Sequence, residues 1–390
     1  MNILFCKHNS ICEPGIIRAL ELLGHKLILP SCSFSHPDTD DAYDTVLCEE
    51  IRKNSFDLVF SVNFIPVIAT VCYRLQVPYF CWIVDSPVIQ LYSHTLQYDS
   101  NYVFLFDYTL YTEFCRKNPG HIFYLPLGCD LPHYDSIIPT PQDHANYDCD
   151  VSFVGSLYTE KSPYHAIRTQ LPSYIQGYFD GILHAQQLVY GYNFLCDIIP
   201  PDLMDTLDQL IDVSPSPGYD LDKRTLLGNL LLNPMCTEME RIHLLNSIGE
   251  HFSLDLYTQS DTSPLKNIRL RGIASSLDGM PKVFKCSKIN LNLTAKGIQS
   301  GASLRIFDVL GCGGFLLSNY QSELPQLFEV GRELVLFDSE ADLLDKISYY
   351  LHHEDERREI AANGYQRIRQ EYSYQARLAL MLDVRHSLSI

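Results

Sequence analysis

Basic side chains are scarce in this 390-residue chain, in which 29 Lys and Arg stand against 47 Asp and Glu, for a formal net charge of −18. Binding to nucleic acid or to an anionic membrane surface depends on clustered Lys and Arg. The sequence therefore argues against both partners. It leaves room for a local basic pocket that could hold a phosphate group.

The chain also lacks any C-x-x-C pair, although it contains 13 cysteines. The number is odd, and cysteines such as Cys72, Cys286 and Cys312 lie in apolar runs, where a thiol behaves as a small hydrophobe. Zinc sites and disulfide frameworks use regularly spaced cysteines. We therefore expect reduced thiols, a cytoplasmic location and no bound zinc.

A long apolar run is missing as well. The most hydrophobic region, residues 58–84, is interrupted by Asn63, Pro66 and Pro78, and only a short apolar run precedes Lys7. A membrane-spanning helix needs about 20 consecutive apolar residues, and a signal peptide needs a longer apolar core than this one. We expect neither a transmembrane segment nor a signal peptide.

Apolar strands and amphipathic helices alternate along most of the chain. Strand-like runs such as NILFCK, FDLVFSVNF and PYFCWIVD are separated by helical patterns in the first third, and VSFVGSL, FSLDLYT, INLNLT and GFLLS follow later. Continuous apolar strands joined by helices predict parallel sheets that are covered on both faces. Since the length suits two domains, we predict an α/β fold of two Rossmann-like, doubly wound domains.

The boundary between the predicted domains lies in a segment rich in Pro, Asp, His and Asn, residues 131–150, which is typical of a linker. We place the first domain at residues 1–146 and the second at 147–370. The second domain carries a helical insertion at about 164–250, where helical patterns separate two strand signals.

The segment SGASLRIFDVLGCGGFLL combines a loop of small residues with a buried helix. Ser300, Gly301 and Ser303 follow a predicted strand, and we expect the helix to begin near Ser303. At the carboxyl end of a parallel strand such a loop exposes backbone N–H groups, and the positive end of the helix dipole favours an anion such as phosphate.

Arg305 and Asp308 are the charged residues of that helix and lie on one face. One interpretation is that they pair with each other across one turn. The other is that Arg305 binds phosphate oxygens and that Asp308 accepts hydrogen bonds from two ribose hydroxyls. Because desolvation makes charges in a buried helix costly, we favour the nucleotide interpretation.

Four stretches together resemble one family. SFVGSLY, WIVDSP, the segment from MPKVFKCSK to GFLLSN, and ERREIAANGYQRI are similar to the CgeB-like spore maturation proteins, which are GT-B glycosyltransferases with a carboxyl-terminal part of the glycosyl transferases group 1 type. The resemblance covers most of the chain except the helical insertion. It implies two domains facing each other across a cleft and a carboxyl-terminal helix, residues 371–390, that returns to the first domain.

The same resemblance assigns residues to a donor site. VGSLYTEK is similar to the G-R-L-x-x-E-K element that holds the donor diphosphate, with Gly155 and Lys161 matching and Ser156 in place of the arginine. FDVLGCGG is similar to the E-A-M-A-C-G turn, with Asp308 at the position of the ribose-binding glutamate. The first glutamate of the retaining enzymes corresponds to Ser300, which is a departure from their pattern.

The reaction implied by this resemblance is transfer of a hexosyl or N-acetylhexosaminyl group from a nucleotide-diphosphate sugar, a UDP-sugar first of all, to a glycan, lipid-linked or protein acceptor. The departing diphosphate gathers negative charge, which the helix end, Arg305 and Lys161 can stabilise. We therefore expect no metal ion and no cofactor, with the nucleotide sugar as co-substrate. The sequence leaves a homo-oligomer open.

An inverting enzyme also needs a general base for its acceptor. Asp85, which directly follows a predicted strand of the first domain, is our first candidate, with a cap of the following turn as its structural alternative. His8 and Asn9 follow the first strand and are second choices. Asn63 and Asp107 also end strands and complete the predicted acceptor side.

Three other functions compete with this one. A sugar-nucleotide epimerase can share the two-domain fold and would isomerise the donor without any acceptor. A catalytically silent sugar- or nucleotide-binding scaffold stays open because of Ser156 and Ser300. A nicotinamide dehydrogenase is disfavoured, because the turn KHNSICEPG after the first strand lacks G-x-G-x-x-G.

Overall fold

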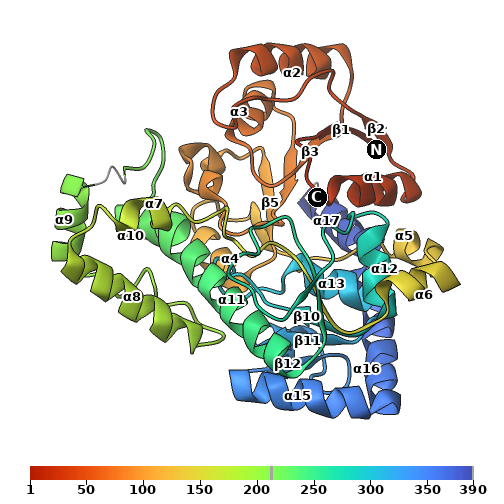
Figure 1. Cartoon of the computed structure of the whole chain (residues 1–390). Helices are drawn as coiled ribbons and strands as arrows, with labels where there is room; N and C mark the ends of the chain where they lie inside the picture. Colours follow the sequence, from red (N-terminus) through yellow and green to blue (C-terminus); the bar gives the residue numbers. More distant parts are fainter. Residues whose placement is uncertain (211–213, 389–390) are drawn as a thin grey trace. The chain divides into compact units, whose positions relative to one another are not determined.

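The computed structural model describes residues 1–210 and 214–388, which form two compact units (Figure 1). The first unit contains Met1–Asp130, Ser216–Asp220 and the chain from Gln370 onward. The second unit contains Leu131–Pro215 and Leu221–Arg369. The carboxyl-terminal helix thus belongs to the first unit, and within it packs against the first helix of the chain.

The first unit is built on a six-stranded parallel sheet with the order β2-β1-β3-β4-β5-β6. Its strands are nearly continuous apolar runs, and β3 and β4 are buried along their whole length, as expected for a sheet covered on both faces. The strands are β1 (Asn2–Cys6), β2 (Lys26–Ile28), β3 (Leu58–Val62), β4 (Tyr79–Trp82), β5 (Asn101–Leu105) and β6 (Ile122–Tyr124), and the longer helices are α1 (Glu13–Leu22), α2 (Asp41–Lys53), α3 (Pro66–Leu75), α4 (Tyr108–Phe114) and α17 (Tyr374–Leu388).

The second unit has its own six-stranded parallel sheet, with the order β12-β11-β10-β7-β8-β9. The chain leaves β7 towards β8 and β9 on one side and then returns to place β10 on the other side of β7. This reversal is a topological switch point, where the loops after two neighbouring strands diverge and leave room for a ligand. The strands are β7 (Cys149–Val154), β8 (Leu254–Tyr257), β9 (Arg269–Leu270), β10 (Ser287–Asn292), β11 (Leu316–Asn319) and β12 (Val335–Phe337).

Helices of two kinds belong to this second unit. Among the described residues, five α-helices lie between β7 and β8, in the region of the predicted insertion: α7 (Tyr164–Arg168), α8 (Ser173–Gln187), α9 (Pro201–Leu210), α10 (Lys223–Leu227) and α11 (Asn233–His251). The others are α5 (Leu131–Ser136), α6 (Pro141–Tyr147), α12 (Gly279–Cys286), α13 (Leu304–Gly311), α14 (Leu324–Leu327), α15 (Glu340–His352) and α16 (Glu354–Arg367).

One apolar core joins the second sheet to α11 and α15. Its members come from strands that are adjacent in the sheet and from one face of each helix, and all are buried: Val151, Phe153, Leu254, Leu256, Ile289, Leu291, Leu317 and Val335 from the sheet, Leu244, Leu245 and Ile248 from α11, and Leu343 and Ile347 from α15. Burial of this set holds β7 and β10 side by side and so fixes the loops that follow them.

Two details of the sequence prediction were wrong. Residues 131–150 are not an extended linker, because α5 and α6 form there and α6 packs against α12. Thr140 and Asp143 form a capping box at the start of α6, with Pro141 in the first turn, and these signals specify a helix. The second unit accordingly starts at Leu131, before the predicted boundary at 146. Strand β12, with three residues, was also not predicted.

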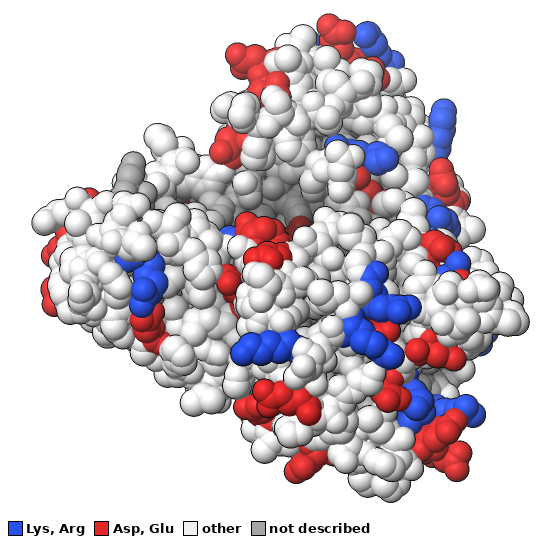
Figure 2. Space-filling model, viewed as in Figure 1, with Lys and Arg blue, Asp and Glu red and all other residues white. Residues whose placement is uncertain are grey.

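The distribution of surface charges and the hydrophobicity of the helices follow from the composition. Figure 2 shows Lys and Arg singly or in small groups beside Asp and Glu, without a continuous basic area among the residues it describes on that face. Within residues 1–210 and 214–388, none of the helices combines the length and the hydrophobicity needed to cross a bilayer.

A glycine decides how closely α16 approaches α13. A Cβ atom at Gly364 would lie 2.4 Å from the backbone oxygen of Glu333 and 2.8 Å from Leu310 Cδ2. We expect Gly364→Ala to lower the free energy of unfolding by about 1–3 kcal/mol through overpacking, although alanine is the better helix former. The measurement is urea unfolding followed by circular dichroism.

Gly181 in α8 is the matched control. It is exposed, and nothing lies within 4 Å of a Cβ atom built there. Gly181→Ala should therefore raise the unfolding free energy by about 0.4–1 kcal/mol. Equal effects of the two substitutions would contradict the packing argument.

Candidate functional site

The carboxyl ends of β7 and β10 define the candidate site in the second unit. The loop after β10 ends in Gly301 and Ala302, both buried, and Ser303 is the N-cap residue of α13, as predicted. The Ser303 side chain accepts no capping hydrogen bond from the helix. The N–H of Ile306 donates to the backbone oxygen of Ser303 at 3.1 Å, so the N–H groups of Leu304 and Arg305 are the donors that this helix end offers to an anion.

The loop before α13 is fixed from both sides. Ser300 Oγ donates to Glu323 Oε1 at 2.5 Å, and the backbone N–H of Glu323 donates to the oxygen of Ser300 at 3.3 Å. Ser303 Oγ lies 3.3 Å from Asn292 Oδ1. Ser300, which stands at the place of a glutamate in the resembled motif, thus contacts a buried carboxylate that comes from elsewhere in the chain.

At its other end, α13 stops at Gly311. Gly313 has a φ of 73°, a left-handed conformation that costs glycine little, and the N–H groups of Gly313 and Gly314 donate back to the oxygens of Leu310 and Val309. The helix is therefore short, and its amino end is fixed with respect to the sheet.

Arg305 and Asp308 pair with each other inside the second unit. Arg305 Nη1 lies 3.0 Å from Asp308 Oδ2, and Tyr134 Oη donates to Asp308 Oδ1 at 2.7 Å. Burial raises the pKa of the Asp308 carboxyl, and Arg305 and Tyr134 oppose that shift. Both carboxylate oxygens thus have donors from the protein. This arrangement corresponds to the first interpretation, in which Arg305 and Asp308 pair with each other across one turn. Binding of ribose by Asp308 stays a prediction.

The guanidinium of Arg305 is held in place by more than its ion pair. Its Cζ lies 5.1 Å from the centre of the Phe284 ring, and Nη1 contacts Met280 Sδ at 3.6 Å. The side chain keeps about a fifth of its surface exposed. Its position is therefore defined while part of the cation remains accessible to a ligand.

The loop after β7 carries the second set of predicted residues. Ser156 Oγ donates to Glu160 Oε1 at 2.7 Å and accepts from the N–H of Tyr158 at 2.8 Å. The Lys161 ammonium lies 4.4 Å from the centre of the Tyr158 ring and is exposed. Gly155 leads from the strand into this turn. The fold thus places Gly155, Ser156 and Lys161 on one of the two loops of the switch point.

Arg241, on α11, joins the two loops and was not predicted. Its Nη1 donates to the backbone oxygen of Ser156 at 2.5 Å, and its Nη2 donates to the backbone oxygen of Leu293, directly after β10. Its Cζ lies 5.4 Å from the Phe153 ring and 4.9 Å from the Tyr158 ring. A buried arginine therefore connects the carboxyl ends of the two strands that flank the switch point.

A signal for Arg241 was present in the sequence. One buried face of α11 repeats at intervals of four, three and four residues, at Thr237, Arg241, Leu244 and Ile248. A charged residue in the apolar stripe of a helix is expected only where it has polar partners. Those partners are backbone oxygens from distant loops, which no local pattern reveals.

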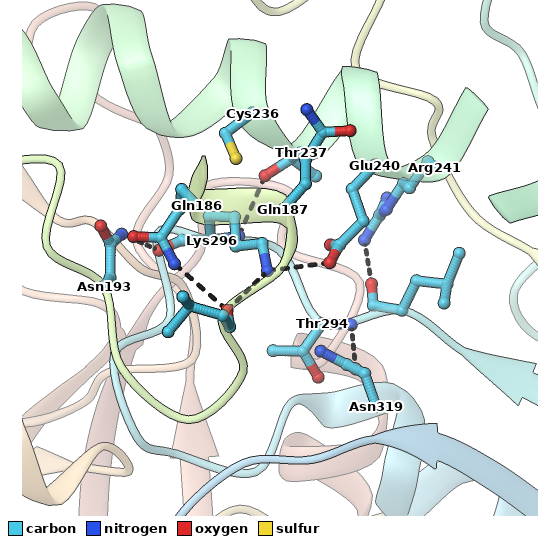
Figure 3. A network of polar contacts seen from close by, with 12 residues as sticks. Gln186, Gln187, Asn193, Cys236, Thr237, Glu240, Arg241, Thr294, Lys296 and Asn319 are labelled. Atoms are coloured by element: carbon cyan, nitrogen blue, oxygen red, sulfur yellow. Dashed lines mark hydrogen bonds and ion pairs between the residues drawn. The ribbon is translucent and has the colours of Figure 1, made fainter. Parts of the chain in front are cut away.

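A buried ion pair lies next to Arg241 (Figure 3). Lys296 Nζ is 2.8 Å from Glu240 Oε1, and both side chains are less than a tenth exposed. The N–H of Lys296 donates to Thr237 Oγ1 at 2.9 Å, and Asn193 Nδ2 donates to the Lys296 oxygen at 2.6 Å. The helical insertion therefore anchors the loop after β10 through both main-chain and side-chain contacts.

The predicted acceptor-side residues lie at the carboxyl ends of strands in the first unit. After β1, the carboxylate of Glu13 accepts from the N–H groups of His8 and Asn9 at 2.7 and 3.2 Å, and His8 Nδ1 lies 3.3 Å from Glu13 Oε1. Glu13 is 1% exposed. The turn is thus held by a buried carboxylate at the start of α1.

Asn63 and Asp85 meet after β3 and β4. Asn63 Nδ2 donates to Asp85 Oδ2 at 2.7 Å, and Asn63 Oδ1 accepts from the N–H of Val84 at 2.9 Å. Asn63 has a φ of 57°, which asparagine tolerates better than most residues. Asp85 is exposed. Asp107 is instead buried, and its Oδ1 accepts from the N–H groups of Thr109 and Leu110 as the N-cap of α4.

One group of potential metal ligands is found within the described residues. His144, Asp148 and Cys286 offer ligand atoms within 4.8 Å of one another. Asp148 directly precedes β7 and Cys286 directly precedes β10, so the group lies at the opposite edge of the sheet from the candidate site. Burial raises the pKa of the Cys286 thiol to about 11, which disfavours the thiolate form that binds metals.

Residues 231–383 match a protein-family model described as glycosyl transferase-like. The match includes the whole of α11 with Arg241, the strands β8–β12, and α13 with the loop before it. It covers less than half of the chain. No curated protein sequence matches the chain significantly.

Solved structures share the fold at low sequence identity. HepE from Anabaena in complex with UDP and glucose is 11% identical, with a TM-score of 0.54, and the match covers 100% of this chain and 99% of that chain. The BGT of phage T4 in complex with UDP-glucose is 8% identical, with a TM-score of 0.53 and 100% of both chains covered. Sucrose-phosphate synthase from Thermosynechococcus elongatus is 10% identical, with a TM-score of 0.52 and coverage of 100% and 99%.

At such identities the likeness concerns the fold. Two parallel six-stranded sheets with flanking helices form the architecture of the GT-B glycosyltransferases, and the predicted fold class is confirmed. The more specific resemblance to CgeB-like proteins stays a prediction.

The contact between Tyr134 and Asp308 gives a test that depends on pH. The hydrogen bond favours the ionised carboxylate, so Tyr134→Phe should raise the folded-state pKa of Asp308 further. The unfolding free energy should fall by about 1.5–3 kcal/mol where Asp308 is ionised. The loss should shrink as the pH falls through the raised pKa, because the protonated carboxyl does not need this donor. Urea unfolding at several pH values measures it.

Tyr349→Phe is the control for this experiment. It removes the same hydroxyl group from an exposed contact with Glu356 Oε2 at 2.9 Å. We expect a change below about 0.5 kcal/mol. A loss at Tyr134 that does not vary with pH would show that the hydroxyl does not act through the Asp308 carboxylate.

Proposed function

We propose that this protein is a glycosyltransferase that transfers a sugar from a nucleotide-diphosphate sugar, with UDP-sugars as the first donors to test. The observation that carries the proposal is the amino end of α13, which follows a loop of small residues at the carboxyl edge of the second sheet. This position is the one where doubly wound folds bind ligands, and the N–H groups of Leu304 and Arg305 at the helix end suit an anionic ligand.

The charges around the site suit the chemistry of glycosyl transfer. A leaving nucleoside diphosphate accumulates negative charge as the bond to the sugar breaks. The amino end of α13, the part-exposed Arg305 and the exposed Lys161 would stabilise that charge through fixed donors. We therefore propose that the transfer proceeds without a metal ion and without a further cofactor.

The comparisons support this proposal without deciding the reaction. The family model described as glycosyl transferase-like includes α13, the loop after β10 and Arg241, and it begins after the loop that follows β7. Structures with the same fold are described in complex with UDP and glucose and with UDP-glucose. These neighbours make UDP the first nucleotide to test.

The acceptor is the less defined substrate. We propose a glycan, a lipid-linked glycan or a protein as the acceptor, a hexose or N-acetylhexosamine as the sugar, and a cytoplasmic location. Asp85 is the proposed general base, because it is exposed and Asn63 orients it. The donor has priority in experiments because its site is better defined.

A nucleotide-binding protein without transferase activity is the second candidate. Both oxygens of Asp308 already have protein donors, and the two serines at the motif positions contact Glu160 and Glu323. Such a protein would bind the donor and release no product. A thermal-shift screen with UDP, GDP, CDP and dTDP sugars, followed by an assay for released nucleotide, separates the two functions.

Ser303→Asp tests the helix amino end directly. Aspartate is a good N-cap residue, so the variant should fold normally, while its charge should repel a diphosphate. We expect the dissociation constant for the donor found in the screen to rise at least tenfold, about 1.4 kcal/mol, as measured by calorimetry.

Ser339→Asp is the matched control, since Ser339 is the exposed N-cap residue of α15 and follows the edge strand β12. It adds the same charge at another helix start of the same unit and should leave donor affinity unchanged. If Ser303→Asp binds the donor as tightly as the wild type does, the proposed position of the phosphates is wrong.

Asp85→Asn tests the proposed base. The amide oxygen can still accept from Asn63, so the local geometry should persist, but the basic carboxylate is lost. We expect the transfer rate to fall by about 10²–10⁴-fold, with donor affinity unchanged. Steady-state kinetics and calorimetry on the same sample separate the two. A variant with full turnover would remove Asp85 from the mechanism.

A further inference from the structure

Arg241 is a buried cation without a carboxylate partner. Its side chain is 8% exposed, and no ion pair to it is found within the described residues. The neighbouring carboxylate, Glu240, is bound to Lys296 at 2.8 Å instead. Figure 3 shows the side chains of Glu240 and Arg241 extending from α11, with Glu240 directed towards Lys296. The rings of Phe153 and Tyr158 and two backbone oxygens face the guanidinium, but they carry no negative charge. A buried charge without an ion pair is costly, so an arginine in this place needs a reason.

The hydrogen bonds of Arg241 do not use its full capacity. A guanidinium has five N–H donors, and this one donates to the backbone oxygens of Ser156 and Leu293. Its Nε is buried and has no hydrogen-bond acceptor. Two backbone oxygens could be held by a neutral amide, so the positive charge exceeds what the tether requires.

The position of Arg241 between the two loops of the switch point indicates a function for its positive charge. Ser156 follows β7 and Leu293 follows β10, and these two strands flank the switch point of the sheet. A Cβ atom at Gly155 would lie 3.9 Å from Arg241 Nη1, so the turn approaches the guanidinium closely. Ser156 itself has a neutral side chain that is engaged with Glu160.

We propose that Arg241 supplies the fixed positive charge that holds the phosphate groups of the donor at the switch point between β7 and β10. The inference rests on the proposed function and deepens it by naming a residue that binds phosphate from the helical insertion. An arginine fork suits phosphate oxygens better than a point charge does. The insertion then takes part in donor binding in addition to anchoring the loop after β10.

Arg241→Gln and Arg241→Lys test the role of the charge. Glutamine can keep a hydrogen bond to a backbone oxygen but carries no charge, and lysine keeps the charge but not the fork. The binding of UDP and of uridine is measured by calorimetry. We expect Arg241→Gln to weaken UDP at least tenfold and to leave uridine unchanged, with Arg241→Lys in between. The salt dependence of UDP binding should also decrease in Arg241→Gln.

Arg357→Gln is the matched control. Arg357 is also buried, its Nη1 donates to the backbone oxygen of Tyr350 at 2.7 Å, and it lines a cavity with Cys149 and Ser287 at the opposite edge of the sheet. This variant should leave the ratio of UDP to uridine affinity unchanged, whatever it does to stability.

The outcomes separate this inference from the proposed function. A wild-type protein that binds neither UDP nor the other nucleotides overturns both. A wild type that binds UDP together with an Arg241→Gln variant that binds it equally well overturns the role of Arg241 alone. A parallel loss of UDP and uridine affinity with a lowered melting temperature would make Arg241 only a tether. An Arg241→Lys variant that binds UDP no better than Arg241→Gln would also contradict the role of charge.

Discussion

The second unit depends on the way its chain winds around β7. Because β8 and β10 lie on opposite sides of that strand, the loops that leave β7 and β10 must diverge, and their polar backbone groups cannot pair with each other through a regular ladder. Arg241 meets this constraint by donating to one backbone oxygen in each loop. The fold therefore creates an open polar edge, and the buried side chain of Arg241 contacts both of its loops.

The helical insertion has a structural role that its composition did not indicate, because it contacts the loops at the switch point. Its last helix, α11, contributes Leu244, Leu245 and Ile248 to the apolar core, so one face is fixed against the sheet. The start of the same helix delivers Thr237 and Arg241 to the loops at the switch point. Core packing and site geometry are thus coupled through one rigid element, which explains how an insertion can position a site without disturbing the sheet.

Much of the fold could be predicted from the sequence. The apolar strands of both sheets and most helices follow from period and composition, because a parallel strand covered on both faces needs a continuous apolar run. The start of α13 at Ser303 was also predictable, since a small N-cap residue precedes an apolar helix. The helices α5 and α6 were missed because their polar sequences resemble a linker, although a capping box and Pro141 mark the start of α6.

The sequence by itself determined the fold class, the loop of small residues and the helix that follows it, because these depend on local preferences and on hydrophobic period. It placed Arg305 and Asp308 on one face but could not decide whether they bind each other or a ligand. Tertiary structure decided that Tyr134 and Arg305 donate to Asp308, that Glu323 reaches Ser300 and that Arg241 reaches two loops. Apart from the pair of Arg305 and Asp308 within α13, each of these contacts joins residues that are far apart in the sequence. The packing of whole elements decides which partner such a buried polar group meets.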